Sequence, residues 1–564
     1  MVLEHIQKRI AFLIPWGAAA ASVFVLTGSI SDPVNVTKLL IAGAFAGALV
    51  LVLAPRGINE IRKNHPVFLI VVALFIIFTF SASIFSASPW VQNFYGIYGR
   101  NTGLLTYLVL SVFALASTLF SNEKQLMRLL VTFFVVGAIN LAYGLWVLIF
   151  GDFMAWNNTY GNLLGLFGNP NFMGAFLGML FALILTYTIA PQTSLKYRIL
   201  GIVLLIITSL EIVETHAVQG VVVSAGAALV CGFFWLWFRF HNRILAWAYI
   251  AISAVAGLVA VAGALQIGPL SEIVYKRSVS LRGIYWNAGI DMGLNHPLTG
   301  VGMDGFGNWY RRSRALKALS DPGAEVTSNA AHNVLIDFFA YGGFPLVLAY
   351  LAIMTVGLIS IVRIGRRQVS FNPLFIGLSL IWICYQTQSI ISINQIGLAI
   401  WGWVITGGLV AYERMTRNGS IEPKSAKVAV TNKAVNSFDS TGLRAFLGLI
   451  IGILIAIPPF TADLTFQTSL NARSADSMAK SLESNYFKPS DSYRLANAVQ
   501  IFDKSNLPEK ALKFARKGVA FNPDFTDAWK MLYYVTGSTA EDKAKAKAQL
   551  IRLDPLNPEW KELP

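Results

Sequence analysis

The sequence predicts an all-α, polytopic membrane protein of about 13 transmembrane helices, with a large external loop and a C-terminal external helical-repeat domain. Of its 564 residues, 55% are hydrophobic and only 13% are charged, about half the charged share of a soluble domain. Apolar stretches long enough to cross a bilayer recur along the chain, and Lys and Arg gather in every second connection between them. This composition excludes a disordered chain and argues against a single soluble globule.

The apolar stretches come at intervals short enough to leave mostly brief connections. The first of them lacks the small-residue cleavage site of a signal peptide and is followed by many further stretches, so we expect it to be a membrane span. Span boundaries are predicted at 10–28, 38–54, 66–84, 103–120, 129–150, 172–190, 199–213, 218–238, 244–267, 344–362, 372–392, 395–412 and 443–460.

The basic residues set the predicted orientation. Every second connection is basic, and these segments hold 20 of the 44 Lys and Arg residues against six acidic residues, which leaves +14 of the net +15. Such a bias marks the cytoplasmic side of a membrane protein. We therefore expect a multi-pass protein of the cytoplasmic (inner) membrane, with its N-terminus cytoplasmic and its C-terminal part external, and no nucleic-acid partner.

Two long segments are then predicted to lie on the external side. A segment rich in Lys, Ser, Asn and Thr is predicted to be a flexible cytoplasmic linker. The predicted organisation is N-terminal transmembrane helices at 1–90, a membrane domain at 91–412 with its external loop at 268–332, the linker at 413–442, a last transmembrane helix at 443–460 and an external helical domain at 461–564.

The C-terminal segment has its own period. Pro489, Pro523 and Pro555 are 34 and 32 residues apart, each beside a helical pattern, and small residues such as Ala511 and Ala515 stand where helices would cross. The period resembles that of tetratricopeptide repeats. It indicates either a docking surface for a protein, peptide or glycan carrier, or a small helical cap.

Neither a metal nor another cofactor is predicted. The two cysteines, Cys231 and Cys384, lie inside apolar runs and cannot form a zinc cluster or a disulfide framework. No Asp-x-Asp pair occurs, so a metal-dependent nucleotide-sugar reaction lacks its usual carboxylates.

Three side chains on the predicted external side carry the most chemical information. His332 lies where the predicted external loop meets a span. A solvated loop histidine without a catalytic role can also lie at such a boundary. Arg282 lies within the loop, and Arg100 lies at the start of a span where orientation bias cannot explain it. An isolated arginine at that depth indicates an anionic group, either a substrate phosphate or a lipid headgroup.

Three motifs resemble those of the O-antigen ligase family, in that family's order. SLRGIYWNAGIDMGLNHPLTGVGMDGFGNW (280–309) is similar to its pattern of an arginine, a tryptophan and Asn-Pro-Leu-x-Gly-x-Gly. AHNVLIDFFAYGGFPL (331–346) is similar to the following His-Asn segment, and GLFGNPNFMGAFLGM (165–179) to the Gly-Asn-Pro-Asn loop that opens a span. The likeness covers about 90–412 of the chain.

The sequence departs from the family pattern at two places. In THAVQGVVVSAG, Gln219 stands where the family usually has an arginine thought to hold donor phosphates, and Tyr341 replaces an acidic residue before the glycine. We expect Arg100 or His216 to compensate for the missing positive charge.

The resemblance implies an inverting, metal-independent glycosyltransferase. It would move a glycan from undecaprenyl pyrophosphate to the hydroxyl of an acceptor glycolipid, glycan or protein at the outer face of the membrane. His332 would accept the acceptor's proton, and Arg282 would stabilise the leaving pyrophosphate. The predicted site comprises His332 and Arg282 as catalytic residues, Arg282, Arg100 and His216 as donor-phosphate ligands, and Asn169, Asn171, Trp286, Asn333 and Asp337 as sugar or acceptor ligands.

Other interpretations stay open at this stage. Asn169 and Asn171 also suit a turn, and Trp286 also suits an interfacial anchor. Ligase, lipid-linked glycan polymerase and protein O-oligosaccharyltransferase share these motifs. A lipid-linked glycan flippase would also have 12 to 14 spans, but the internal repeats and mid-membrane charges typical of transporters are not visible.

Overall fold

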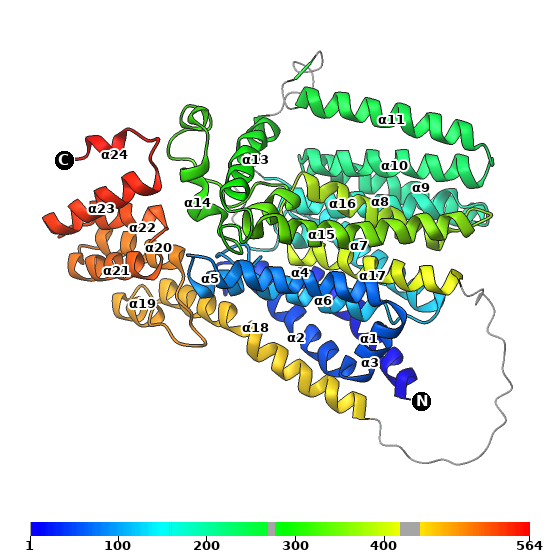
Figure 1. Cartoon of the computed structure of the whole chain (residues 1–564), viewed down its shortest axis with the longest axis horizontal. Helices are drawn as coiled ribbons and strands as arrows, with labels where there is room; N and C mark the ends of the chain where they lie inside the picture. The colour runs from blue at the N-terminus through cyan, green and yellow to red at the C-terminus, as the bar shows by residue number, and fades with distance from the viewer. Residues whose placement is uncertain (1, 157, 159–160, 265–266, 269–276, 418–439) are drawn as a thin grey trace.

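The computed structural model describes residues 2–156, 158, 161–264, 267–268, 277–417 and 440–564, and these residues form helices without a β-strand (Figure 1). A bundle of long helices makes up most of the molecule, and shorter helices pack at one end of it. The bundle comprises α1 (Val2–Val23), α2 (Asn35–Leu53), α3 (Arg56–Asn64), α4 (Pro66–Ile84), α5 (Trp90–Tyr95), α6 (Leu104–Ser117), α7 (Glu123–Phe150), η1 (Gly165–Phe167), α8 (Pro170–Ile189), α9 (Leu195–Glu214), α10 (Val218–Phe238), α11 (Arg243–Ala264), α15 (Val334–Arg367), α16 (Pro373–Ile390), α17 (Ile396–Arg417) and α18 (Ser440–Ala472).

The remaining helices lie toward the end of the bundle where α18 terminates, on the left of Figure 1. They are α13 (Arg277–Asn295), α14 (Phe306–Ser313), η2 (Leu316–Leu319), α19 (Ala475–Ser481), α20 (Ser492–Lys504), α21 (Pro508–Phe521), α22 (Thr526–Tyr534), α23 (Ala540–Leu553) and α24 (Glu559–Glu562). We call this end of the bundle the tail end and residues 473–564 the tail.

Each predicted apolar stretch lies largely within a helix of the bundle. Within the described ranges, eight helices are long and apolar enough to cross a membrane: α2, α4, α7, α8, α10, α15, α17 and α18. Two more apolar helices are shorter, at Leu104–Ser117 and Arg243–Val259. The chain is therefore a multi-pass, all-helical membrane protein, with exposed apolar side chains such as Ile70, Ile206 and Leu258 on the flanks of the bundle.

Glycines bring α2 and α18 into close contact. Gly43 and Gly47 are four residues apart on α2, and Gly448 and Gly452 are four apart on α18. A Cβ atom on Gly47 would lie 2.2 Å from the carbonyl oxygen of Gly448, so the two backbones pack without room for side chains. Small residues at this spacing are typical of membrane helix pairs. This contact fixes α18, which carries the tail.

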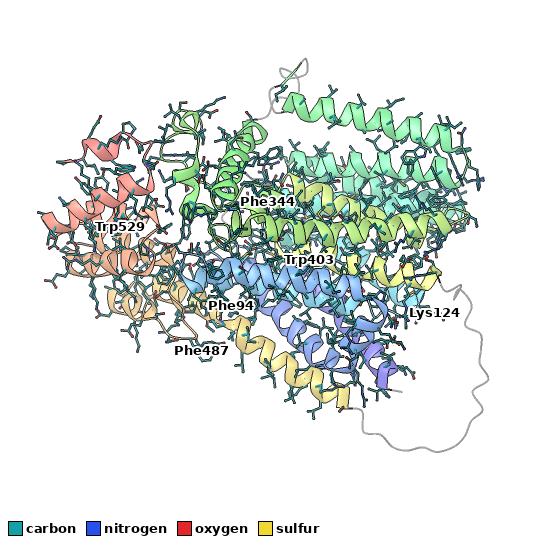
Figure 2. The ribbon with its side chains drawn as sticks, in the orientation of Figure 1. Phe94, Lys124, Phe344, Trp403, Phe487 and Trp529 are labelled. Atoms are coloured by element: carbon teal, nitrogen blue, oxygen red, sulfur yellow. The ribbon has the colours of Figure 1, made fainter. Side chains whose placement is uncertain are left out.

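The helix α18 continues through Pro458 and Pro459 to Ala472, so the boundary predicted at 460 falls inside it. Part of the predicted linker, residues 418–439, lies outside the described residues. At the other end of the bundle from the tail, Figure 2 shows Lys124, and the basic residues at the C-terminal ends of α15 and α17 belong to the same side.

The tail has a hydrophobic core of its own, in which α20 packs on α21 and α22 on α23. Buried ion pairs join it to the membrane domain. The Asp554 carboxylate accepts hydrogen bonds from Arg314 at 2.6 Å and from Arg311 at 3.2 Å, and all three side chains are at most 4% exposed. Arg312 also lies 3.5 Å from the Asp524 carboxylate. The tail is therefore docked against α14 rather than held only by α18.

Candidate functional site

A polar cavity of about 500 Å³ opens at the tail end of the bundle. Five of the predicted site residues line it: Arg100, Asn169, Asn171, Arg282 and His332. They come from four separate parts of the chain, so the fold assembles them. We call this space the polar cavity.

His332 is held at the start of α15 by its neighbours. Its φ angle is +57°, a left-handed conformation that is uncommon for a residue with a side chain and that often marks functional sites. On one side, the Ala331 N–H donates to Asp337 Oδ1 at 2.6 Å. On the other side, Asn333 caps α15, its Oδ1 accepting from the N–H groups of Leu335 and Ile336. The imidazole lies near the Tyr285 ring, with 5.9 Å between ring centroids.

Arg100 is presented by a tight loop between α5 and α6. Gly96 has a φ of +87°, and a Cβ atom there would lie 2.5 Å from the Thr102 backbone nitrogen, so the turn requires glycine. The buried Asp304 carboxylate fastens this loop, since its Oδ2 accepts from the Ile97 N–H at 2.8 Å. The pKa of Asp304 is raised overall, because burial outweighs the lowering by its hydrogen bonds and by the charge of Arg100.

Arg282 projects into the polar cavity from α13. Burial lowers the pKa of its guanidinium. In the part of the chain that the structure describes, neither Arg282 nor Arg100 forms an ion pair with a carboxylate. Two half-buried guanidiniums that form no ion pair among the described residues have the chemistry to bind an anion such as a phosphate.

The two arginines also act on His332. Burial lowers the pKa of His332 to about 3, and the positive charges of Arg100 and Arg282 lower it as well. The imidazole is therefore neutral at pH 7 in the protein without its substrates, and it can accept a proton. An anionic ligand on the arginines would offset their charge and raise the pKa of His332.

Asn169 and Asn171 form part of the wall beside η1. The Asn169 side chain caps α8 by accepting from the Asn171 N–H at 2.9 Å, and Pro170 begins the helix. This is the contact expected of a turn. The Asn171 side chain also lines the cavity and is available to hydrogen-bond a ligand.

Four other predicted residues are not among those that line the polar cavity. The exposed His216 ring contacts the Glu214 carbonyl oxygen, and the indole nitrogen of Trp286 is buried. Asn333 and Asp337 lie behind His332, where both bond to the backbone around it. The last two therefore position His332.

The two departures from the family pattern have different surroundings. Gln219 is buried and donates to Gln388 Oε1 at 2.9 Å, away from the polar cavity. Tyr341 is also buried, and its hydroxyl lies 3.4 Å from Asp304 Oδ1. The second positive charge of the cavity comes from Arg100.

Sequence reasoning missed several residues of the cavity wall. Asp32, on the connection between α1 and α2, has one buried carboxylate oxygen without a hydrogen-bond partner among the described residues. Burial raises the pKa of Asp32 to about 6, and the Asp463 carboxylate raises it as well. Asn394 and Gln395, between α16 and α17, also line the cavity. A run of polar residues between two apolar spans is the signal that could have revealed them.

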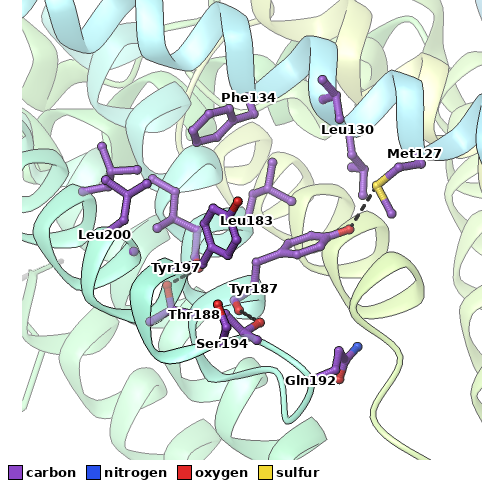
Figure 3. A pocket seen from close by; sticks show the side chains of 15 residues that line it. Met127, Leu130, Phe134, Leu183, Tyr187, Thr188, Gln192, Ser194, Tyr197 and Leu200 are labelled. Atoms are coloured by element: carbon purple, nitrogen blue, oxygen red, sulfur yellow. Dashed lines mark hydrogen bonds between the residues drawn. The ribbon is translucent and has the colours of Figure 1, made fainter.

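A second cavity, of about 510 Å³, lies between α7, α8 and α9 (Figure 3). Its described lining includes Tyr187 and Tyr197 but no acidic, basic or histidine side chain. It lies at the C-terminal end of α8, about 20 Å along that helix from the polar cavity. Among the described residues, no group of three or more His, Cys, Asp or Glu side chains is placed to hold a metal ion.

Comparison with known families identifies the central part of the chain. The family model described as O-Antigen ligase matches residues 206–351. No curated protein matches the chain. The matched segment contains Arg282 and His332, and it supports assignment to the O-antigen ligase family, that is, to the membrane enzymes that ligate or polymerise glycans.

Proposed function

We propose that this O-antigen ligase domain transfers a glycan from undecaprenyl pyrophosphate to an acceptor hydroxyl at the outer face of the cytoplasmic membrane. The observation that carries the proposal is that His332, Arg100 and Arg282 line one cavity at the tail end of the bundle. A reaction that removes a proton and expels a pyrophosphate needs a base and fixed positive charges. A neutral imidazole and two guanidiniums that are not paired with a carboxylate among the described residues supply them.

The proposed reaction is a single displacement with inversion at the sugar's anomeric carbon. His332 takes the proton of the acceptor hydroxyl, and the hydroxyl oxygen forms a bond to the anomeric carbon. The bond from that carbon to the pyrophosphate oxygen breaks, and the electron pair leaves with the pyrophosphate. Arg282 and Arg100 stabilise the charge that develops there, so the reaction needs no metal ion.

The surroundings suggest roles for the other residues. Asn171 carries an amide that can both donate and accept hydrogen bonds, as sugar hydroxyls require, and Gln395 has a buried amide oxygen without a partner among the described residues. Asn333 and Asp337 hold the backbone on either side of His332. We propose that the tail lies outside the membrane and is a tetratricopeptide-like array, as the helix pairs α20–α21 and α22–α23 suggest.

The acceptor separates three related activities: ligation to a glycolipid, polymerisation of lipid-linked glycan, and transfer to a protein. Deletion of the gene followed by mass analysis of the glycan conjugates that disappear would distinguish them. Complementation with His332→Ala tests the proposal itself. We expect no transfer in that strain, with lipid-linked donor accumulating in the outer leaflet. If instead the donor failed to reach the outer leaflet, the chain would be a transporter.

A further inference from the structure

A second external cavity adjoins the polar cavity and is formed jointly by the membrane domain and the tail. It has a volume of about 570 Å³, within the range of pockets that bury a small ligand. We call it the tail cleft. Its lining includes Tyr98 from the membrane domain and Tyr493, Asn497 and Gln500 from the tail.

The tail cleft shares a wall with the polar cavity. Ser31 and Tyr98 line both spaces and form part of the wall between them. The Ser31 hydroxyl donates to Gln467 Oε1 at 2.6 Å, and the neighbouring Asp32 N–H donates to Asp463 Oδ2 at 2.8 Å. A ligand in the tail cleft that extends past Tyr98 therefore arrives beside the unpartnered carboxylate oxygen of Asp32 in the polar cavity.

The cleft is formed before any ligand arrives. The Tyr493 hydroxyl donates to Asn329 Oδ1 at 3.0 Å, and Asn522 donates to Gln92 Oε1 at 3.2 Å. With the Asp554 ion pairs, these bonds fix the tail against the membrane domain on both sides of the cleft. A preformed cleft reduces the entropy lost on binding.

The lining of the cleft suits a carbohydrate. Tyr98 and Tyr493 contribute half-buried aromatic side chains to the lining, and aromatic side chains can pack on the C–H face of a sugar. Asn497 and Gln500 are exposed amides on α20, each able to donate to and accept from hydroxyl groups. Within the described residues no strand is present, so the cleft has no sheet edge on which a peptide could add a strand.

Most charges of the cleft are paired. Arg311 is paired with Asp554, and Lys530 with Glu325. Arg494 lies over the Tyr98 ring, and Asp527 supplies one negative charge in the same lining. A lining whose charged side chains sum to only +1 offers little to bind a polyanion.

We propose that the tail cleft binds the acceptor, and that the acceptor is an uncharged saccharide whose hydroxyl reaches His332 past Tyr98. This inference rests on the proposed function, since it assigns the acceptor of that reaction. The tail is then the part of the chain that selects the acceptor.

Photo-crosslinking in native membranes tests the occupant. A benzoylphenylalanine replaces Gln500 in the full chain, and another replaces Lys504, which is equally exposed on α20 but outside the cleft. We expect a light-dependent adduct at 500 whose mass spectrum shows hexose losses, and none at 504. A peptide adduct, an adduct that carries polyprenyl pyrophosphate, or no adduct at 500 would each overturn the assignment.

Kinetics give a second, independent readout with the purified full chain. With the conjugate identified by crosslinking as acceptor, Asn497→Ala should raise the acceptor KM about tenfold through loss of hydrogen bonds, with kcat and the donor KM unchanged. Lys504→Ala should change neither. An unaltered acceptor KM in Asn497→Ala would refute the role of the cleft. If His332→Ala still transferred glycan, the catalytic proposal would fail, while the crosslink at 500 would still report what the cleft binds.

Discussion

Neighbouring residues set both the backbone conformation and the charge state of His332. The bonds made by Asp337 and Asn333 hold it in a left-handed conformation, and burial with two arginines keeps its imidazole neutral. Under the proposed function, binding of the donor pyrophosphate would offset the charge of the two arginines and raise the pKa of His332 toward that of an effective base.

The pH dependence of donor capture tests this coupling. Arg100→Gln removes one of the two positive charges that disfavour the imidazolium, so the pKa of His332 should rise. The acid limb of kcat/KM, which reports the free enzyme, should then move to higher pH even though the overall rate falls. Arg473→Gln, an exposed arginine outside the polar cavity, serves as the control. An acid limb that stays in place would show that the charge of Arg100 does not lower the pKa of His332.

The shape of the guanidinium at 282 should matter as much as its charge. Arg282→Lys keeps the positive charge but removes the planar fork that binds phosphate in a bidentate way. Loss of such transition-state stabilisation costs about 3 to 4 kcal/mol, so turnover should fall about 100- to 1,000-fold. Arg473→Lys should have no effect on turnover. Measured in detergent with purified protein, near-normal turnover of Arg282→Lys would remove this contact from the mechanism.

Some residues of the polar cavity and its surroundings could be singled out from the sequence, and others could not. Arg100 was predictable because it breaks the charge bias of its side of the membrane, and His332 and Arg282 because they stand in recognisable motifs. The role of Asp304 was not predictable, because it depends on a loop 207 residues away, that of Ile97. His216 was close in sequence to a family motif, but the turn after α9 directs its ring toward the Glu214 carbonyl.

At the scale of elements, the N-terminus of α15 is the part that aims the base. Asp337 acts there through the backbone of Ala331. Asp337→Asn retains a carbonyl oxygen that can accept this bond, so activity should stay within about threefold of normal. Asp337→Ala leaves the N–H unpaired at a cost of about 1 to 3 kcal/mol, so activity should fall about 5- to 150-fold.

The two Asp337 variants need a control for loss of a helix cap in general. Asn372→Ala removes the corresponding cap from α16, at the far end of the bundle, and should leave turnover unchanged. If Asp337→Asn were as inactive as Asp337→Ala, the negative charge itself would be required, and Asp337 would have more than a positioning role.

The helices themselves were easier to predict than their partners. Apolar length alone located the segments that form α2 and α18, yet they are about 400 residues apart in sequence and pack closely together. Two pairs of glycines could have indicated this contact: Gly43 with Gly47, and Gly448 with Gly452. Glycines four residues apart on two spans are typical of closely packed membrane helices. The end of α18 was harder, because two prolines suggest a break that the helix does not make.

At the scale of the whole molecule, the polar cavity and the tail lie at the same end of the bundle, and the basic connections lie at the other. We predict that the tail end is external. A cysteine at Ser320 should react with an impermeant thiol reagent in intact spheroplasts, whereas one at Ser121, exposed at the opposite end, should react only after lysis. The native Cys231 and Cys384 are buried and should label little. The reverse pattern would invert the orientation and place the reaction on the cytoplasmic side.

We propose that this chain itself catalyses glycan transfer, with His332 as the base. The most direct measurement is transfer by the purified full chain in detergent, from a defined undecaprenyl-pyrophosphate glycan, with excess chelator present. We predict that the wild-type chain forms the conjugate without metal, and that His332→Gln, which can hydrogen-bond but cannot accept the proton, binds the donor normally and loses turnover. Normal turnover by His332→Gln, or a strict requirement for a divalent metal ion, would contradict the account.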